Sequence, residues 1–418
     1  MPGHAAMRER GEEVDVAIVG GGPAGLGAAV ELRRLGVARV LILEREAQAG
    51  GIPRHCGHYP FGMREFHRLL RGPDYAARLV RRAEAAGAII RTGTTVTGLG
   101  SGGELAVTDD RGTGTIQARA VLLATGVRET SRAARLIGGE KPGGILPTGA
   151  LQGLVYLNGQ KPFDRPVILG SELVAFSALL TCRHAGIRPV AMIEAGDRAT
   201  ARWPVPLLAR ILGVPFLADT QIEAIRGTRR VECVEIAGTA GKRRLETDGV
   251  IVTGRFRPEA TLLRESGLTI DPATGGPEVD AWGRLSDPAY FAAGNLLRGV
   301  ETAGWSWAEG LRAARAIAAS LDGHLPTGDR QARIALAHAA LKFAMPQILP
   351  MAPAEGRGQT PFLQIRLATP VRGRLCLWQG DRLIAYRRLN HRPEQRILMQ
   401  LPTLDPKAPP PRLTIEPS

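Results

Sequence analysis

Apolar and polar positions follow two different spacings over the first 44 residues. Residues 14–19 form a short, mostly apolar run, and three glycines follow it. This pattern predicts a buried strand followed by a tight turn. Residues 23–35 then carry apolar side chains at helical spacing, and a second apolar run, residues 40–43, ends at Glu44. The pattern predicts a strand–helix–strand unit whose turn has the sequence GGGPAG at residues 20–25.

The same order of elements returns between residues 166 and 194. There an apolar run ends at Gly170, a helical pattern follows, and a second run ends at Glu194. Each of the two cycles closes with an apolar strand followed by Thr-Gly, at residues 120–126 and 249–254. Two strand–glycine–helix–strand–acid units in matching order predict two nucleotide-binding folds rather than a chance similarity.

Other apolar patterns predict helices at residues 74–86 and 301–321, and strands at residues 88–91, 104–108, 115–119, 290–295, 362–368, 374–378 and 383–388. We therefore expect an α/β fold with two dinucleotide-binding, Rossmann-like domains and a small C-terminal β-rich appendage. The expected bounds are 1–130 with 255–330 for a discontinuous first domain, 131–254 for the second domain, and 345–418 for the appendage.

The first glycine turn has the chemistry of a diphosphate site. Gly20 permits the turn, Gly22 lets the backbone approach a pyrophosphate, and Gly25 lets helix and strand pack closely. The helix that begins at Pro23 offers free N–H groups and a partial positive charge to an anion. Glu44, at the tip of the second strand, is placed to accept hydrogen bonds from ribose hydroxyls. The first unit therefore predicts a dinucleotide site.

The second glycine turn departs from this chemistry. Glu172 stands where the second glycine of the fingerprint belongs, and it adds bulk and a negative charge beside the expected anion. Two unit charges about 4 Å apart repel by about 4 kcal/mol at a surface-like dielectric. We therefore expect the second unit to serve as scaffold or partner-docking surface rather than to bind NAD(P) or another nucleotide. If a nicotinamide nucleotide does bind, Glu194 favours NAD over NADP.

Composition changes this picture little. The net charge of +14 comes mostly from arginines scattered along the chain, and aromatic residues make up only 5%. Without a basic run interleaved with aromatics we expect no nucleic-acid binding, but a basic surface that steers acidic partners or is simply solvated. No apolar stretch is long enough for a transmembrane segment, and residues 1–13 lack the apolar core of a signal peptide, so we expect a cytoplasmic protein.

The cysteines and histidines predict neither a redox pair nor a metal site. The four cysteines lie far apart, form no CxxC pair and lack iron–sulfur spacing, which favours small buried hydrophobic side chains; they are Cys56, Cys182, Cys233 and Cys376. His55 and His58 flank Cys56, but a complete ligand set is missing from this stretch. No catalytic residue can be assigned from the pattern.

Several motifs together resemble a known superfamily. The glycine turn, Glu44, ATG at 124–126 and AAGN at 292–295 occur in the order of the two-dinucleotide-binding-domain flavoproteins, the FAD-dependent pyridine-nucleotide-disulfide-oxidoreductase-like superfamily. More narrowly, the chain resembles the FAD-binding alpha subunits of dye-linked dehydrogenases of the hydrogen cyanide synthase, opine oxidase and D-hydroxyproline dehydrogenase types. The motifs that carry this resemblance are GGIPRHCGH at 50–58, FGMREF at 61–66, TGVRE at 125–129 and SALL at 177–180. The resemblance covers roughly residues 14–320.

The resemblance implies bound FAD in the first domain. The residues that it assigns to the cofactor are Gly20, Gly22, Pro23, Ala24, Gly25, Glu44, Arg45, Gly51, Val96, Thr125, Gly126, Gly294, Asn295, Ala303 and Gly304. Glu44 would contact the adenosine ribose and Val96 would lend its backbone to the adenine, whereas Ala303 and Gly304 would face the pyrimidine end of the flavin. Asn295 stands where the superfamily usually has Asp, and its amide can still donate and accept at a ribityl hydroxyl.

The resemblance also implies a function. The chain would be the FAD-containing oxidoreductase subunit of a multisubunit dehydrogenase of amino acids or amines. It would relay electrons to an acceptor from an amino or imino acid that is oxidised in a second flavin subunit, and a small iron–sulfur subunit would be a further partner. Two alternatives stay open: a self-sufficient NAD(P)H-dependent flavin reductase, and an assembly subunit with structural FAD. The appendage is expected to be either a docking element or a lid that stabilises the core.

Overall fold

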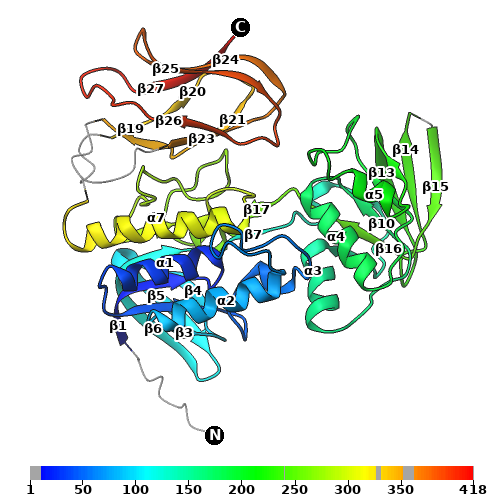
Figure 1. Cartoon of the computed structure of the whole chain (residues 1–418), viewed down its shortest axis with the longest axis horizontal. Coiled ribbons are helices and arrows are strands. Elements are labelled where there is room, and N and C mark those ends of the chain that lie inside the picture. Colours follow the sequence, from blue (N-terminus) through cyan, green and yellow to red (C-terminus); the bar gives the residue numbers. More distant parts are fainter. Residues whose placement is uncertain (1–10, 240, 326–330, 352–361, 418) are drawn as a thin grey trace, which may run out of the picture. The chain divides into compact units, whose positions relative to one another are not determined.

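The computed structural model describes residues 11–239, 241–325, 331–351 and 362–417. These residues form two compact units. The first unit comprises the described parts of 1–50, 79–126 and 258–418, and the second comprises 51–78 and the described parts of 127–257. Figure 1 colours the chain from its N-terminus to its C-terminus.

A seven-stranded sheet forms the centre of the first unit. Its order is β3-β2-β1-β6-β5-β4, and β18 pairs with β6. The strands are β1 Gly11–Val19, β2 Val40–Leu43, β3 Ile89–Arg91, β4 Thr95–Leu99, β5 Glu104–Asp109, β6 Gly112–Leu123 and β18 Tyr290–Ala292. Strands β3, β2, β1, β6 and β18 are parallel, and β4, β5 and β6 are antiparallel. Because both faces of the central strands are covered, Val16, Ala17 and Ile18 are fully buried.

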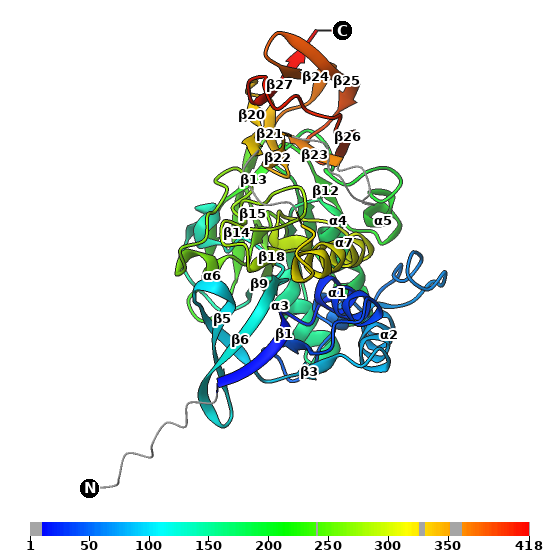
Figure 2. The ribbon, with the colours of Figure 1, turned by 90° about the vertical axis from the view of Figure 1, so that its left-hand side faces the viewer.

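Helices α1 (Pro23–Arg34) and α7 (Ala303–Leu321) lie side by side in the first unit (Figures 1 and 2). Glycines allow this close contact. A β-carbon at Gly27 would lie 2.9 Å from the carbonyl oxygen of Trp307, and a β-carbon at Gly310 would overlap the carbonyl oxygen of Ala24. The backbones of the two helices therefore approach each other where no side chain fits.

The second unit repeats the plan around a parallel five-stranded sheet of order β12-β11-β10-β16-β9. These strands are β9 Ile145–Pro147, β10 Pro166–Leu169, β11 Ala191–Ile193, β12 Phe216–Leu217 and β16 Gly249–Val252, and the helices are α3 Thr148–Gln152, α4 Leu173–His184 and α5 Leu207–Ile211. The order β11-β10-β16 matches β2-β1-β6 of the first unit, which confirms the prediction of two Rossmann-like folds.

A second, four-stranded sheet of this unit was not predicted. Its order is β15-β14-β13-β8, with β8 Gly138–Gly139, β13 Thr220–Arg226, β14 Cys233–Gly238 and β15 Gly241–Glu246. Sequence reasoning missed it because β15 is almost entirely exposed and polar, so its apolar periodicity is weak.

The C-terminal strands form a small β-rich part of the first unit, as predicted. One sheet has the order β20-β27-β24-β25, another β21-β23-β26, and β19 pairs with β22. The strands are β19 Gln331–Arg333, β20 Ala335–Leu336, β21 Leu341–Met345, β22 Ile348–Pro350, β23 Phe362–Leu367, β24 Val371–Gln379, β25 Arg382–His391, β26 Ile397–Gln400 and β27 Pro411–Glu416. Apolar residues from both larger sheets share one core, including Leu363, Leu375 and Leu413. We call this part, the described residues of 331–417, the C-terminal sandwich.

Shorter elements are also present in the described chain. They are η1 Ile52–His55, η2 Ser101–Gly103, η3 Ala133–Arg135, the π-helical turn η4 Gly153–Leu157, η5 Gly294–Leu296, helices α2 Gly72–Ala85 and α6 Thr261–Arg264, and strands β7 Val127–Arg128 and β17 Arg257–Pro258. No helix among the described residues is long and apolar enough to cross a membrane.

Most predicted elements are confirmed, and one strand differs. Residues 115–119 and 120–126 were expected as separate strands, but β6 is continuous from Gly112 to Leu123. Its burial alternates at first and becomes complete where the strand enters the sheet centre, so one strand shows two patterns. The predicted domain bounds stay a prediction; the compact units differ from them in placing residues 51–78 with the second unit and the C-terminal sandwich with the first.

The contact between α1 and α7 yields a stability prediction. Gly310→Val forces a branched side chain against the Ala24 carbonyl oxygen, so we expect a loss of about 1–3 kcal/mol in the free energy of unfolding, as for other overpacked sites. Urea unfolding followed by circular dichroism measures it. Gly267→Ala is the control, because nothing lies within 4 Å of the added β-carbon. Equal stability of Gly310→Val and the wild-type protein would contradict this packing.

Candidate functional site

Close packing requires glycine at two positions of the first glycine turn. Gly20 has φ +111°, and a β-carbon there would lie 2.5 Å from the carbonyl oxygen of Ala124, just after the end of β6. A β-carbon at Gly25 would overlap the carbonyl oxygen of Gly20. Gly22 is different: its backbone is extended, with φ −82° and ψ −176°, so its conformation does not require glycine. The turn therefore packs directly against the end of β6.

The N-terminus of α1 faces this turn without a capping side chain. Pro23 is its first residue, and the first helical hydrogen bond runs from the Leu26 N–H to the Gly22 carbonyl oxygen at 2.9 Å. No side chain of the described residues caps the helix, so the N–H groups of its first turn remain suited to an anion. This arrangement agrees with the diphosphate chemistry expected from the sequence.

Glu44 lies under the same turn and is 8% exposed. Its Oε2 accepts the Gly21 N–H at 2.9 Å, and its Oε1 accepts the Glu46 N–H at 2.9 Å. The carboxylate thus fixes the turn to the tip of β2, and its remaining lone pairs can still accept hydroxyl groups. The Gly50 N–H donates to the Gly21 carbonyl oxygen at 2.7 Å, and this bond holds Gly50 against the turn.

The other predicted residues of the first unit lie around its sheet. Arg45 is exposed beyond β2, and Val96 is buried on β4. The Thr125 hydroxyl donates to the Glu259 carbonyl oxygen at 2.9 Å, and Gly126 has φ +76°. Gly51 opens η1 and falls in the second unit.

Three segments converge near Gly294. This residue has φ +76°, and a β-carbon on it would lie 2.8 Å from Ala24 Cβ in α1 and 3.8 Å from Ser306 Oγ in α7. Ser306 is 5% exposed, and its hydroxyl has no hydrogen-bond partner among the described residues. A buried hydroxyl without a partner is costly and points to a group that is bound when the site functions. Sequence reasoning missed Ser306 because a single serine in a helix carries no pattern.

Asn295 and the start of α7 complete this region. Asn295 Oδ1 accepts the Glu301 N–H at 2.8 Å, and its Nδ2 donates to the Glu301 carbonyl oxygen at 3.2 Å. Ala303 and Gly304 are the first two residues of α7, whose N-terminus has no side-chain cap in the part of the chain that the structure describes. The N-termini of α1 and α7 thus both present free backbone donors in the first unit.

The turn of the second unit is closed by its own side chain. Glu172 precedes α4, its Oε2 accepts the Ser171 N–H at 2.9 Å, and its Oε1 accepts the Thr253 hydroxyl at 3.0 Å. A β-carbon at Gly254 would overlap this carboxylate, and one at Gly170 would lie 2.7 Å from Oε2. The Glu172 carboxylate therefore lies at the turn where a diphosphate would approach the backbone.

The two units also differ in which carboxylate accepts the N–H that follows the first glycine of the turn. In the first unit the Gly21 N–H donates to Glu44. In the second unit the corresponding N–H, that of Ser171, donates to Glu172, while the Ser171 hydroxyl donates to Glu194. In both units this N–H therefore bonds to a carboxylate, and in the second unit that carboxylate belongs to the turn itself.

Buried charges surround Glu172. Burial raises the pKa of Glu172 despite its hydrogen bonds and the nearby Arg135. Burial also raises the pKa of Glu129, whose Oε1 accepts the Gly254 N–H at 3.0 Å and whose Oε2 accepts the Gly149 N–H at 2.8 Å. The pKa of Arg135 is lowered by burial, and its guanidinium donates to the Gly254 carbonyl oxygen at 2.7 Å. The charged groups around the second turn therefore bond to one another and to the backbone of the turn.

The cysteines are buried, as predicted. Cys56, Cys182, Cys233 and Cys376 are free thiols. Burial raises the pKa of Cys56 and that of Cys182 to about 12, so both thiols are neutral at physiological pH. Cys56 donates weakly to Gln152 Oε1 at 3.5 Å. These thiols are therefore unsuited to nucleophilic attack.

Comparisons with known proteins place this geometry in a family. The family model described as pyridine nucleotide-disulphide oxidoreductase matches residues 14–317. One opine oxidase subunit of Rhizobium meliloti (strain 1021) is 27% identical over 336 residues, which cover 73% of this chain and 71% of that protein. A putative glutamate synthase [NADPH] small chain of Cereibacter sphaeroides is 29% identical over 359 residues, which cover 76% of this chain and 78% of that protein.

Solved structures share the fold. The structure of T. acidophilum thioredoxin reductase superposes with a TM-score of 0.62 and 25% identity, covering 74% of this chain and 99% of that one. L-proline dehydrogenase from P. horikoshii superposes with a TM-score of 0.59 and 20% identity, covering 76% of this chain and 57% of that one. The second likeness shows the fold alone.

The buried Glu172 yields a pH-dependent prediction. Its pKa is raised in the folded state, so ionising it disfavours folding, and stability falls as pH rises from its unfolded pKa through its folded pKa. Glu172→Gln removes this loss. We expect the variant to be more stable than the wild-type protein at pH 7–8 and equally stable below about pH 4.

Thermal unfolding from pH 3 to pH 8 measures this difference. The exposed Glu265→Gln provides the matched control and should follow the wild-type protein at every pH. A stability gap between Glu172→Gln and the wild-type protein that does not change with pH contradicts the buried-carboxylate interpretation.

Proposed function

The chain belongs to the pyridine nucleotide-disulphide oxidoreductase family, and we propose that within it the chain is the FAD-containing subunit of a multisubunit dehydrogenase of amino acids or amines. The family and the fold make the chain an FAD-dependent oxidoreductase. Its part in the proposed complex is to take electrons from a substrate oxidised in a partner subunit, and to pass them to an acceptor. A cytoplasmic location is part of this proposal.

The first unit supplies the residues for FAD in this proposal. The N–H groups at the start of α1 bind the diphosphate, and Glu44 orients the adenosine ribose. The uncapped start of α7 binds the pyrimidine end, and the unpaired Ser306 hydroxyl donates to the cofactor nearby. Bound FAD supplies the electron-carrying chemistry, which no protein side chain provides. The protein's part is to bind, orient and shield it.

The observation that carries the choice between functions is the Glu172 carboxylate in the second turn. A self-sufficient NAD(P)H-dependent flavin reductase needs a nicotinamide nucleotide at that turn, and the Glu172 side chain takes the space beside Gly170 and Gly254 that the nucleotide would approach. The name of the Cereibacter relative includes NADPH, but that property belongs to that protein. In this chain the second turn supports a scaffold or docking role instead.

The buried cysteines narrow the proposal further. Exchange of electrons with a disulfide substrate requires an accessible thiolate. All four cysteines of this chain are buried free thiols. A flavin in this chain therefore needs an electron partner other than its own thiols, which supports a second subunit.

The names of two relatives agree with a subunit role. One relative is a subunit of opine oxidase and the other is a small chain of glutamate synthase. We propose two partners: a second flavin subunit that oxidises an amino or imino acid, and a small iron–sulfur subunit. An assembly subunit with structural FAD remains the alternative. It is distinguished by whether substrate reduces this chain's flavin in the assembled complex purified from the native host.

The isolated chain should bind FAD yet be a poor enzyme. Denaturing the purified yellow protein should release FAD, and anaerobic mixing with NADH, NADPH or amino acids should leave the flavin absorbance unchanged on a turnover timescale. Dithionite provides the positive control for a reducible flavin. Fast bleaching by NADH would favour the flavin reductase, and fast bleaching by an imino acid without a partner would refute the division of labour.

Removing Glu172 should open the second turn. Glu172→Gly removes the side chain that fills the turn, so we expect NADH to bind at least about tenfold tighter than to the wild-type protein, or about 1.4 kcal/mol. Titration calorimetry measures the affinity, with Glu265→Gln as the charge-matched control. Unchanged NADH binding in Glu172→Gly would show that this carboxylate does not close the site.

A further inference from the structure

A buried cluster of charged groups joins the C-terminal sandwich to the loop between Gly294 and Ala303. Its centre is Glu301, whose side chain is 5% exposed. Glu301 Oε1 accepts Gln364 Nε2 at 2.6 Å and Arg366 Nη2 at 2.7 Å, and its Oε2 accepts Arg396 Nη1 at 2.6 Å. All three donors come from the sandwich, so the carboxylate of this loop residue is held from the C-terminal side.

A second buried pair runs through the same region. Arg298 is 1% exposed and donates to Glu309 Oε2 at 2.9 Å, to the Gly294 carbonyl oxygen at 3.1 Å and to Gln364 Oε1 at 2.9 Å. Gln364 therefore accepts from Arg298 and donates to Glu301. One side chain of β23 connects both charged groups, and each buried charge has partners.

Trp305 in the first turn of α7 is fixed by the same groups. Its Nε1 donates to Glu309 Oε1 at 2.9 Å, and the Arg396 guanidinium lies 3.7 Å from the centre of its ring. Arg312 lies over the same ring at 5.5 Å. The start of α7, which the proposed function assigns to the flavin, is thus contacted by an arginine of the sandwich.

Asn295 links this cluster to the proposed cofactor. Its amide donates to the Glu301 carbonyl oxygen and accepts the Glu301 N–H, which closes the loop between them. An aspartate could accept that N–H but could not donate to the carbonyl oxygen. The loop geometry therefore gives a reason for an amide at this position, where the resembling superfamily usually has Asp.

We propose that the C-terminal sandwich positions the FAD site: Arg366 and Arg396, acting through Glu301, hold Asn295 and the 294–302 loop in the conformation that binds the cofactor. This inference rests on the proposed function, because that function assigns the loop to FAD. It gives the sandwich a role in cofactor affinity, in place of a docking element or a lid that only stabilises the core. Arg366 and Arg396 are positioning residues that need not touch FAD.

The test uses the full-length chain stripped of FAD and titrated with FAD by flavin fluorescence. Arg366→Met and Arg396→Met should each weaken FAD binding at least tenfold, and Arg366→Lys should recover part of the loss. Asn295→Asp should also weaken binding, because the carboxylate cannot donate to the Glu301 carbonyl oxygen. Each loss should appear as faster FAD release, since a loosened loop no longer retains the cofactor.

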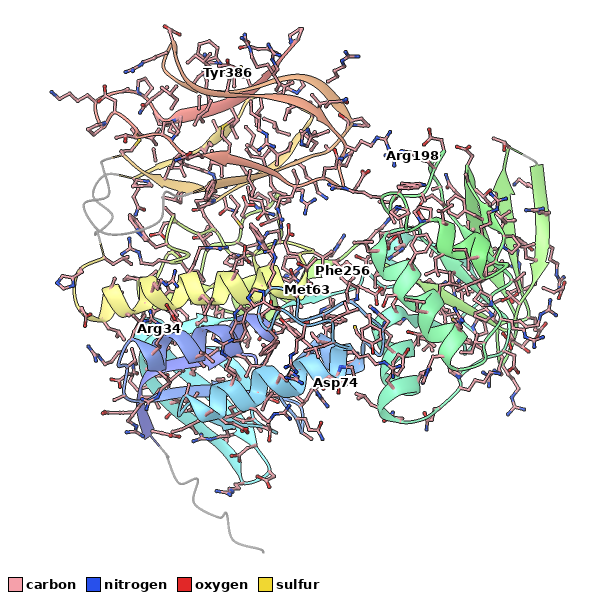
Figure 3. The ribbon with its side chains drawn as sticks, in the orientation of Figure 1. Arg34, Met63, Asp74, Arg198, Phe256 and Tyr386 are labelled. Atoms are coloured by element: carbon pink, nitrogen blue, oxygen red, sulfur yellow. The ribbon has the colours of Figure 1, made fainter. Side chains whose placement is uncertain are left out.

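Arg374→Met is the matched control. Arg374 belongs to β24 of the same sandwich, pairs with Glu416 at 2.7 Å and lies over the ring of Tyr386, which is labelled in Figure 3. Neither partner belongs to the Glu301 cluster. This variant should bind FAD like the wild-type protein even if its unfolding temperature falls.

The outcomes separate this inference from the proposed function. If the wild-type chain binds no FAD, the proposed function fails. If the wild-type chain binds FAD and the Arg366, Arg396 and Asn295 variants bind it equally well, only the positioning role fails, whatever happens to the unfolding temperature of the apoprotein. If Arg366→Met does not fold, FAD binding by Arg396→Met and Asn295→Asp tests the positioning role. The Arg396 side chain is 26% exposed, compared with 14% for Arg366, so its replacement disturbs the core less.

Discussion

The steric limit at the first glycine turn is the constraint on which the rest of this protein depends. Gly20 and Gly25 have backbone atoms where any side chain would need space, and Gly310 and Gly27 impose the same limit between α7 and α1. These contacts bring the end of β6, the start of α1 and the start of α7 together. The proposed FAD site uses backbone N–H groups from more than one of these segments, so the segments must lie close together. Glycine allows this, because it has no side chain to separate them.

The two units share one fold and differ at their glycine turns. Both have a glycine turn after their first strand and an acid at the tip of the next strand. In the first unit Glu44 accepts the Gly21 N–H, and the N-terminus of α1 has no side-chain cap among the described residues. In the second unit the Glu172 side chain occupies the turn and bonds to the Ser171 N–H and the Thr253 hydroxyl. In the proposed function this one side chain distinguishes the scaffold turn from the FAD-binding turn.

Several arginines of this chain connect parts of the first unit. The net charge is +14, and several of the arginines are buried and paired. Arg298 has its charge satisfied by Glu309, and Arg366 and Arg396 share Glu301. The Arg366 side chain is 14% exposed, and this burial lowers its pKa. Such groups remain in place only while all their partners are present, so the C-terminal sandwich and the 294–302 loop stabilise each other.

The sequence by itself determined the two Rossmann-like units, the position of the first glycine turn, the acid at its strand tip and the burial of the cysteines. These features follow from local rules: apolar runs bury, glycines turn, and helices begin where the chain leaves a turn. Only the tertiary structure decided that Glu172 turns its carboxylate onto its own turn, that the Ser306 hydroxyl lacks a partner among the described residues, and that Asn295 belongs to a loop held by the C-terminal sandwich. Residues such as Glu301 and Arg366 lie 65 positions apart in the sequence, and no periodicity records a contact over that separation. Local patterns fix the elements, whereas the directions of individual side chains depend on neighbours that only folding brings together.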